Sequence, residues 1–403
     1  MASTIPTLTD NHLANVRLEI RHLQGALVTW RRQLHQNPEL GFQEQETAAF
    51  IAQKLTEWGI PHRTGIAQTG IVAIIEGKKS GKVLAIRADM DALPIQEKND
   101  VPYRSRRDGV MHACGHDGHT AIALGTAYYL WQQRSRLVGT VKIIFQPAEE
   151  GPGGAKPMIE AGILQNPDVD AIVGLHLWNN LPVGTVGVRQ GALMAAVECF
   201  RCTILGKGGH GAMPHQTIDA VLVGSQIVNA LQTIVARNVD PLNAAVVTVG
   251  EFQAGTALNV IADTARISGT VRYFNSKLEG FIQQRIEAII AGVCQSHGAS
   301  YDLDYWQLYP ATVNDPEMAA LIQSVAAAVV ETELGVVPEC QTMGGEDMSF
   351  FLKEVPGCYF FLGAANAAKK LDYPHHHPRF DFDESVLCVG VEMFVRCVEK
   401  FCL

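Results

Sequence analysis

Short runs of aliphatic and β-branched residues alternate with longer amphipathic stretches in the first part of the chain. The runs GIVAIIEG and KVLAIRAD have the length and composition of strands, whereas AIALGTAYYLWQQR, which follows a loop at 98–119, has the composition of a helix. Strands that alternate with helices predict an α/β fold, in which a mostly parallel sheet is flanked by helices.

The pattern changes at about residue 192. Four strand-like runs, VECFRCTIL, NAAVVTVGEFQAG, TARISGTVRYF and ASYDLDYW, then occur together with two long helical stretches, which predicts an α+β unit of a common domain size. From roughly residue 305 the first pattern returns, and it ends in a helix that begins near Glu384. We therefore predict one domain at 1–191 and 305–403, with a second domain inserted at 192–304.

Length, charge and hydrophobic runs limit the kinds of protein to which this chain can belong. A chain of 403 residues exceeds the size at which one core stops growing, which also favours two domains. The net charge of −9 and the lack of a Lys/Arg stripe argue against nucleic-acid binding. The chain shows neither the charged-then-apolar pattern of a signal peptide nor an apolar run of about 18 residues, so we expect a cytoplasmic protein without a membrane partner.

Potential metal ligands are concentrated in the segment MHACGHDGHTA. It contains His112, Cys114, His116, Asp117 and His119 within a glycine-containing loop. Thiolate and imidazole are natural ligands for Zn²⁺, and less specifically for Mn²⁺, Co²⁺ or Ni²⁺. We interpret the segment as part of a metal site; loop histidines with satisfied hydrogen bonds are the alternative.

Two adjacent carboxylates, Glu149 and Glu150, end the strand-like run VKIIFQPAEE and precede the glycine-rich GPGG. Neighbouring side chains at a strand end can point in different directions. One carboxylate can then ligate a metal while the other removes a proton from water. An exposed acidic turn is the alternative interpretation.

Further candidates come from other parts of the chain. His176 lies at the end of the apolar run VGLHLWN, where it could instead be a satisfied core histidine, and YPHHHPRFDFDE supplies His375, His376 and His377. Ligands of parallel sheets bind beyond the carboxyl ends of the strands. Five candidates fall at predicted strand ends of this kind: Asp89, Asp91, Glu149, Glu150 and His176.

Nine sequence motifs are distributed over nearly the whole chain: LHQNPELGFQEQETA, RADMDALPI, MHACGHDGHTA, FQPAEEGPGGAKPMIEAG, GLHLWN, GKGGHGAMPH, GTALNVIAD, MGGEDMSFFL and HHPRFDFDE. In these motifs and in their order the chain resembles the amidohydrolase branch of the aminoacylase/carboxypeptidase metallopeptidase superfamily. This branch includes N-acyl-amino-acid amidohydrolases, hippurate hydrolases and auxin-conjugate hydrolases. It implies a zinc-exopeptidase-like catalytic domain and an inserted lid and dimerisation domain.

The resemblance also implies roles for residues of the first domain. The implied metal ligands are Cys114, His116, Glu150, His176 and His376. His376 stands two residues before Pro378, as in the family motif, and His375 and His377 are its rivals. Glu149 matches the general base, and Asp91 matches the residue that supports the metal site. Where other branches have a ligand histidine this chain has Asp89, which fits the cysteine-containing ligand set.

Three residues of the inserted domain match functional positions of the family. His210 of GKGGHGAMP matches a histidine that reaches the active site of the partner subunit and stabilises the oxyanion. Asn259 and Arg272 match positions associated with the substrate carboxylate, although Arg272 could also be a surface charge. The resemblance therefore implies a homodimer that forms through the inserted domain.

Together these features predict an enzyme that uses two divalent metal ions, with Zn²⁺ as the first expectation. We expect it to hydrolyse the amide bond of N-acyl amino acids and to release a carboxylic acid and a free amino acid. A dipeptidase or carboxypeptidase of the same superfamily is the alternative. A metal-binding protein without catalysis would lack the base, and Glu149 is present.

Overall fold

The computed structural model describes residues 13–330 and 335–402. Contacts between residues divide the chain into two compact units. Unit 1 comprises Met1–Leu193, Val313–Gln341 and Asp347–Leu403, and unit 2 comprises Met194–Thr312 and Thr342–Glu346. Assignment of these units as a catalytic domain and a lid and dimerisation domain stays a prediction.

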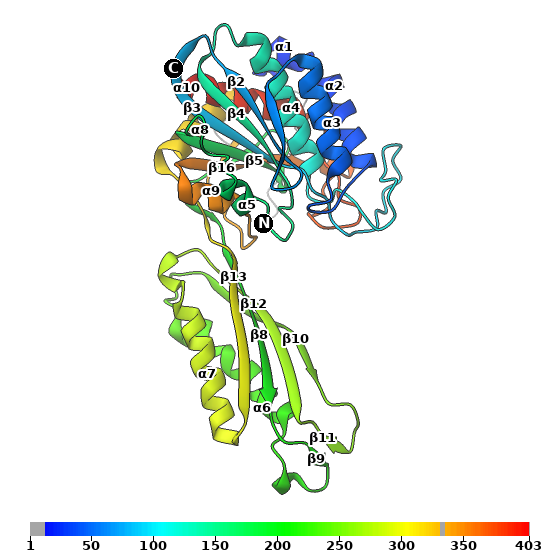
Figure 1. The fold of residues 1–403 in the computed structure, drawn as a ribbon, viewed down its shortest axis with the longest axis vertical. Helices are drawn as coiled ribbons and strands as arrows, with labels where there is room; N and C mark the ends of the chain where they lie inside the picture. Colours follow the sequence, from blue (N-terminus) through cyan, green and yellow to red (C-terminus); the bar gives the residue numbers. More distant parts are fainter. Residues whose placement is uncertain (1–12, 331–334, 403) are drawn as a thin grey trace. The chain divides into compact units, whose positions relative to one another are not determined.

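Unit 1 is built on an eight-stranded sheet with the order β1-β2-β4-β3-β5-β16-β6-β15 (Figure 1). Its strands are β1 (His62–Ile66), β2 (Gly70–Glu76), β3 (Lys79–Asp89), β4 (Val138–Gln146), β5 (Ala171–Pro182), β6 (Val186–Gly187), β15 (Val336–Val337) and β16 (Gly357–Ala365). The central strands β4, β3, β5 and β16 are parallel to their neighbours within this group. The predicted α/β fold with a mostly parallel sheet is confirmed.

Helices flank this sheet (Figure 1). They are α1 (Leu18–Arg21), α2 (Gln24–Gln36), α3 (Gln45–Trp58), α4 (His116–Gln133), α5 (Ala155–Glu160), α8 (Pro316–Val329), α9 (Met348–Glu354) and α10 (Val386–Cys402). Strand β5 is buried from Ala171 to Leu177 without alternation, as expected for a strand that is covered on both faces. Because β3, β4 and β5 are parallel, their carboxyl ends lie at the same edge of the sheet.

Helix α4 begins earlier than the sequence suggested. The predicted loop at 98–119 was wrong at its end, because α4 starts at His116 and its N-cap is Gly115, which has a φ of 95°. A residue with a side chain rarely adopts this left-handed conformation, so glycine is required at the turn into the helix. His116 and His119 therefore lie on the first turn of a helix, where their spacing is fixed.

Unit 2 has its own sheet and its own core. The four-stranded antiparallel sheet has the order β10-β12-β8-β13. Its main elements are β8 (Ala196–Leu205), α6 (Ala220–Leu231), β10 (Ala245–Ala254), β12 (Thr264–Tyr273), α7 (Phe281–His297) and β13 (Ser300–Tyr309). Helices α6 and α7 pack on the sheet through a hydrophobic cluster that includes Phe200, Ile227, Ile267 and Ile286. This is the α+β architecture that the sequence indicated.

One helical stretch of the described chain, Ala220–Asn238, is long and apolar enough to cross a membrane. Its buried positions Ala220, Val223, Ile227 and Leu231 recur every three or four residues and belong to the core of unit 2. Such spacing is typical of an amphipathic helix packed against a sheet.

Candidate metal centre

Candidate ligands from four segments of unit 1 meet at the carboxyl edge of the sheet. Cys114 and His116 lie at the start of α4, Glu150 in the loop after β4, His176 on β5, and His376 in the segment before α10. The potential donor atoms of Cys114, His116 and His176 all lie within 4.8 Å of one another, and so do those of Cys114, Glu150 and His376. The structure thus brings together all five predicted ligands.

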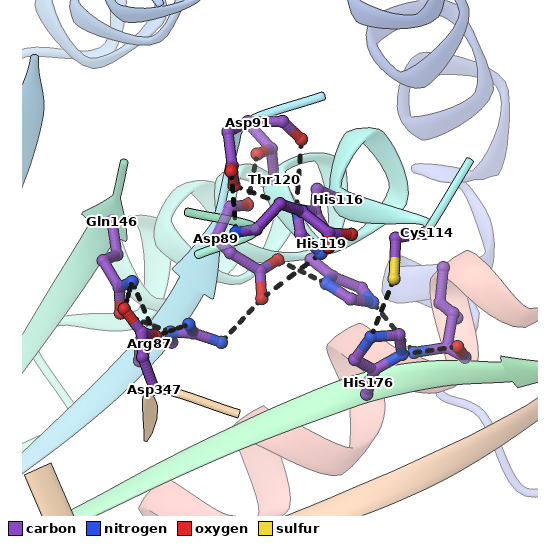
Figure 2. Close-up of polar contacts among 12 residues, drawn as sticks. Arg87, Asp89, Asp91, Cys114, His116, His119, Thr120, Gln146, His176 and Asp347 are labelled. Carbon is purple, nitrogen blue, oxygen red and sulfur yellow. Dashed lines mark hydrogen bonds and ion pairs between the residues drawn. The ribbon is translucent and has the colours of Figure 1, made fainter. Parts of the chain in front are cut away.

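Hydrogen bonds behind two of the rings fix which nitrogen faces this cluster. His116 Nδ1 donates to the carbonyl and the carboxylate of Asp91, at 3.0 and 3.1 Å, and His176 Nδ1 donates to the carbonyl of Leu177 at 2.7 Å. In the neutral form of each ring, Nε2 therefore carries the lone pair. His176 Nε2 lies 3.4 Å from Cys114 Sγ, as Figure 2 shows. This is the tautomer that a metal ligand needs.

His119 is also buried beside the cluster, but both of its ring nitrogens are engaged. Its Nδ1 lies 2.5 Å from Asp89 Oδ1, and its Nε2 accepts the backbone N–H of Leu177 at 2.8 Å (Figure 2). Neither nitrogen then has a free lone pair for an ion. His119 instead fixes the backbone next to His176, a role that the sequence did not reveal although the residue stood within the motif.

The structure separates the three successive histidines. His375 is half-buried, donates through Nε2 to Leu177 O at 2.9 Å, and stacks on Trp178. His377 accepts the N–H of Arg379 through Nδ1 and stacks on Tyr373. His376 has Nε2 3.1 Å from Glu150 Oε1. Its φ of 63° is a strained value for a residue with a side chain, which is often found at functional sites.

The two predicted carboxylates lie in a closed loop, residues 147–154, that joins β4 to α5. The backbone N–H of Gly153 bonds Ala148 O at 3.0 Å, and a Cβ at Gly154 would lie 1.8 Å from Pro147 O. Only glycine allows the two ends of the loop to approach this closely. Within the loop the N–H of Glu150 donates to Asp91 Oδ2 at 3.0 Å. Glu149 is 7% exposed, so the alternative interpretation of this residue as part of an exposed acidic turn is wrong.

The electrostatics of the cluster fit divalent cations. Burial, together with the carboxylates of Glu150 and Glu149, raises the pKa of the Cys114 thiol well above its ordinary value. A thiolate at this position therefore needs a compensating positive charge. His116 Nε2 is buried and has no hydrogen-bond partner among the residues that the structure describes. A bound cation would satisfy that lone pair, so the side chains present fit the expected metal.

The remaining predicted site residues belong to unit 2. His210 lies on β9 (Gly209–His210), which pairs with β11 (Val260–Ile261), and its side chain is exposed. Asn259 is exposed and immediately precedes β11. Arg272 is half-buried on β12 and donates to Met343 O at 3.4 Å. These three residues are therefore not among the side chains that converge in unit 1.

Comparisons with known proteins agree with this geometry. The profile described as peptidase family M20/M25/M40 matches residues 85–400. The N-acyl-L-amino acid amidohydrolase of Geobacillus stearothermophilus is 47% identical over 292 residues, which cover 72% of this chain and 78% of the relative. Thermostable carboxypeptidase 2 of Saccharolobus solfataricus is 40% identical over 390 residues, covering 95% and 97% of the two chains.

A solved structure is similar over almost the same length. A Bacillus subtilis protein, described as a dinuclear metal-binding peptidase from the M20 family, is 38% identical with a TM-score of 0.81. The match covers 94% of this chain and 99% of that chain.

Proposed function

Because this chain belongs to peptidase family M20/M25/M40, as its motifs predicted, we propose that it hydrolyses the amide bond of small N-acyl amino acids. The products are a carboxylic acid and a free amino acid. The family and the named relatives support metal-dependent amide hydrolysis. One observation carries the proposal: five potential ligands, Cys114, His116, Glu150, His176 and His376, converge beside the buried carboxylate of Glu149.

The converging side chains would hold two divalent ions. Zn²⁺ suits a set that contains one thiolate and three imidazoles, and Mn²⁺, Co²⁺ and Ni²⁺ are the alternatives. When bound, such ions polarise the substrate carbonyl and make water a stronger acid near neutral pH. Asp91 orients the His116 ring from behind, as outer-shell carboxylates do.

Glu149 acts as the general base. Its carboxylate removes a proton from the attacking water and returns the proton to the leaving amine, so that the amine departs neutral. Burial among the ligands keeps the carboxylate close to the reacting atoms and limits competing solvent. The position of Glu149 next to Glu150 supports this role, because the two neighbours share one short loop.

We also propose roles for three residues of unit 2: His210, Asn259 and Arg272. The N–H of Ala212 donates to His210 Nδ1 at 3.0 Å, so the neutral ring carries its proton on the exposed Nε2 and can donate it to an oxyanion. We assign the substrate carboxylate to Asn259 and Arg272. In the family pattern His210 serves the partner subunit, which supports a homodimer formed through unit 2.

A carboxypeptidase is the second candidate, because a relative with 40% identity carries that name. The two functions differ in whether the substrate carries an acyl group or a free amine. The deciding experiment assays the purified, zinc-loaded protein on N-acetyl, N-benzoyl and indoleacetyl amino acids and on matched dipeptides. Preference for the acylated series supports the proposal, and a preference for dipeptides replaces it with the second candidate.

A further inference from the structure

The loop that carries Glu149 and Glu150 is held at both of its ends by one buried carboxylate. Asp347 Oδ2 accepts the backbone N–H groups of Gly154 and Ala155, each at 3.0 Å. Both carboxylate oxygens of Asp347 also lie 2.8 Å from Nε2 of Gln146, the last residue of β4. Gln146 enters the loop and Gly154 leaves it, so Asp347 closes the loop from outside.

A buried guanidinium holds this carboxylate in place. Arg87 on β3 is 1% exposed and donates to Asp347 Oδ1 at 2.8 Å and to Gln146 Oε1 at 2.8 Å (Figure 2). A carboxylate at 0% exposure is costly unless it is paired and hydrogen-bonded. Arg87 therefore makes it possible for a charged Asp347 to bind the loop in the interior.

The same guanidinium reaches the segment that carries His176. Arg87 donates to Asp89 Oδ2 at 2.6 Å, and Asp89 holds His119, which in turn accepts the N–H of Leu177. Figure 2 shows this chain of contacts from Gln146 and Asp347 to His176. The Arg87 guanidinium thus connects the loop of Glu149 and Glu150 with the strand of His176.

We infer that Asp347, Gln146 and Arg87 are positioning residues that set the place of the Glu149–Glu150 loop, and hence the affinity for metal and the turnover rate. The inference rests on the proposed function for the roles of the two glutamates. Outer-shell partners of metal ligands typically contribute about 10- to 100-fold in metal affinity or activity. Asp347 acts on the loop through backbone N–H groups rather than through a ligand ring, and one of its carboxylate oxygens also lies within 4.8 Å of a carboxylate oxygen of Glu149.

If the ion pair of Asp347 and Arg87 only stabilised the fold, its loss would lower Tm without changing Zn²⁺ affinity or kcat. The chain offers a matched control for this case in another buried carboxylate. Glu392 on α10 is also a fully buried carboxylate that accepts from arginines, at 3.0 Å from Arg17 Nε and 2.5 Å from Arg396 Nε. It contacts none of the candidate ligands. Removing either buried charge destabilises the fold, so loss of thermal stability alone does not distinguish the two roles.

The test compares Asp347→Asn, Gln146→Met and Glu392→Gln with the wild type. Arg87, the Gln146 amide and the backbone N–H groups of Gly154 and Ala155 all donate to Asp347, so the amide of an asparagine would place N–H groups against some of these donors. Gln146→Met keeps the volume and the net charge and removes only the polar contacts. Zn²⁺ affinity is measured by competition with a chromophoric chelator, and kcat and KM are measured on an N-acyl amino acid.

We expect Asp347→Asn and Gln146→Met to weaken binding of at least one Zn²⁺ by about 10- to 100-fold, with a similar loss in kcat and a much smaller change in KM. Glu392→Gln should lower Tm and leave Zn²⁺ affinity and kcat unchanged. If Asp347→Asn does not fold, Gln146→Met decides. Wild-type Zn²⁺ affinity and kcat in the folded variants would overturn the inference.

Failure of the proposed function has a separate signature. In that case the wild-type protein hydrolyses none of the N-acyl amino acids, whereas Zn²⁺ affinity still reports whether the loop is held by Asp347 and Gln146.

Discussion

At the scale of single residues, the atoms behind each histidine ring determine what the ring can bind. In the neutral rings of His116 and His176, Asp91 and the carbonyl of Leu177 accept from Nδ1 and leave Nε2 as the acceptor, whereas Asp89 and the Leu177 N–H occupy both nitrogens of His119. The motif MHACGHDGHTA gathers these residues but does not contain their hydrogen-bond partners. The sequence could therefore indicate the cluster of candidate ligands. Only the fold distinguishes the proposed ligands His116 and His176 from His119, whose two nitrogens are both engaged.

Replacing the proposed base tests the chemistry directly. Glu149→Gln should lower kcat by about 10²- to 10⁴-fold, because the amide cannot accept the proton from water. Metal content, measured by elemental analysis after gel filtration, should stay at the wild-type level. Cys114→Ala is the contrasting variant, since loss of a ligand sulfur should lower the metal content itself. Near-normal turnover by Glu149→Gln would remove this residue from the mechanism.

The choice among the three histidines has its own test. His376→Asn should lower the amount of bound Zn²⁺, because asparagine tolerates the left-handed φ of 63° but does not replace the imidazole. His377→Asn, next to it in the chain, should bind as much Zn²⁺ as the wild type. The sequence left this choice open because the directions of adjacent side chains depend on the backbone dihedral angles, which the sequence alone does not give. Equal metal loss in both variants would contradict the assignment of His376.

At the scale of elements, a buried cluster joins α2, the start of α4 and the segment near Glu97. His35 on α2 lies 2.8 Å from Asp117 Oδ2 through Nδ1 and 3.3 Å from Glu97 Oε1 through Nε2. Burial and Arg31 act to lower the pKa of His35, but hydrogen bonds with Asp117 and Glu97 outweigh them and raise it to about 9. The sequence predicted the helix of AIALGTAYYLWQQR, which lies in α4, from its composition, yet it gave no sign of this polar contact with α2.

The free energy of unfolding should depend on pH through this histidine. His35 has a higher pKa in the folded state than the ordinary value of about 6.5, so the folded state binds its proton more tightly. The stabilisation is fully present below about pH 6.5 and is lost as the pH rises toward 9. Its size is at most about 3 kcal/mol.

Urea unfolding from pH 6 to pH 9 measures this dependence. The wild type should lose stability over this range relative to His35→Gln, and the difference between the two profiles isolates the contribution of His35. His22→Gln, at an exposed position preceding α2, is the control and should follow the wild type. Parallel profiles for wild type and His35→Gln would show that His35 is neutral in the folded protein.

At the scale of the whole molecule, two separate hydrophobic clusters account for two units. The change from alternating strands and helices to an antiparallel pattern is visible in the sequence, because it alters the period of apolar positions. The segment Thr342–Glu346, which joins unit 2 through the bond from Ala195 N–H to Gly344 O, could not be foreseen. Five residues are too few to show a period, and their contacts are set by the fold.

Metal binding should stabilise only one of the two units. All five proposed ligands lie in unit 1, so each bound Zn²⁺, at about 100 times its Kd, should stabilise that unit by about 2.7 kcal/mol. Differential scanning calorimetry with Zn²⁺ or with a chelator should then shift one transition and leave the other in place. The variant Cys114→Ala should reduce the shift, and an equal shift of both transitions would show that metal binding is coupled to unit 2.

The closed loop at 147–154 limits how the proposed general base can move. Pro147 O and Gly154 approach each other closely, and Asp347 binds the Gly154 N–H and the side chain of Gln146, so these contacts restrain the backbone that carries Glu149. If Glu149 is the base, as proposed, it carries the proton from water to amine by rotation about side-chain bonds, which is faster than the microsecond-to-millisecond motion of hinges and lids. The step that removes and returns the proton should then proceed without waiting for any rearrangement of this loop.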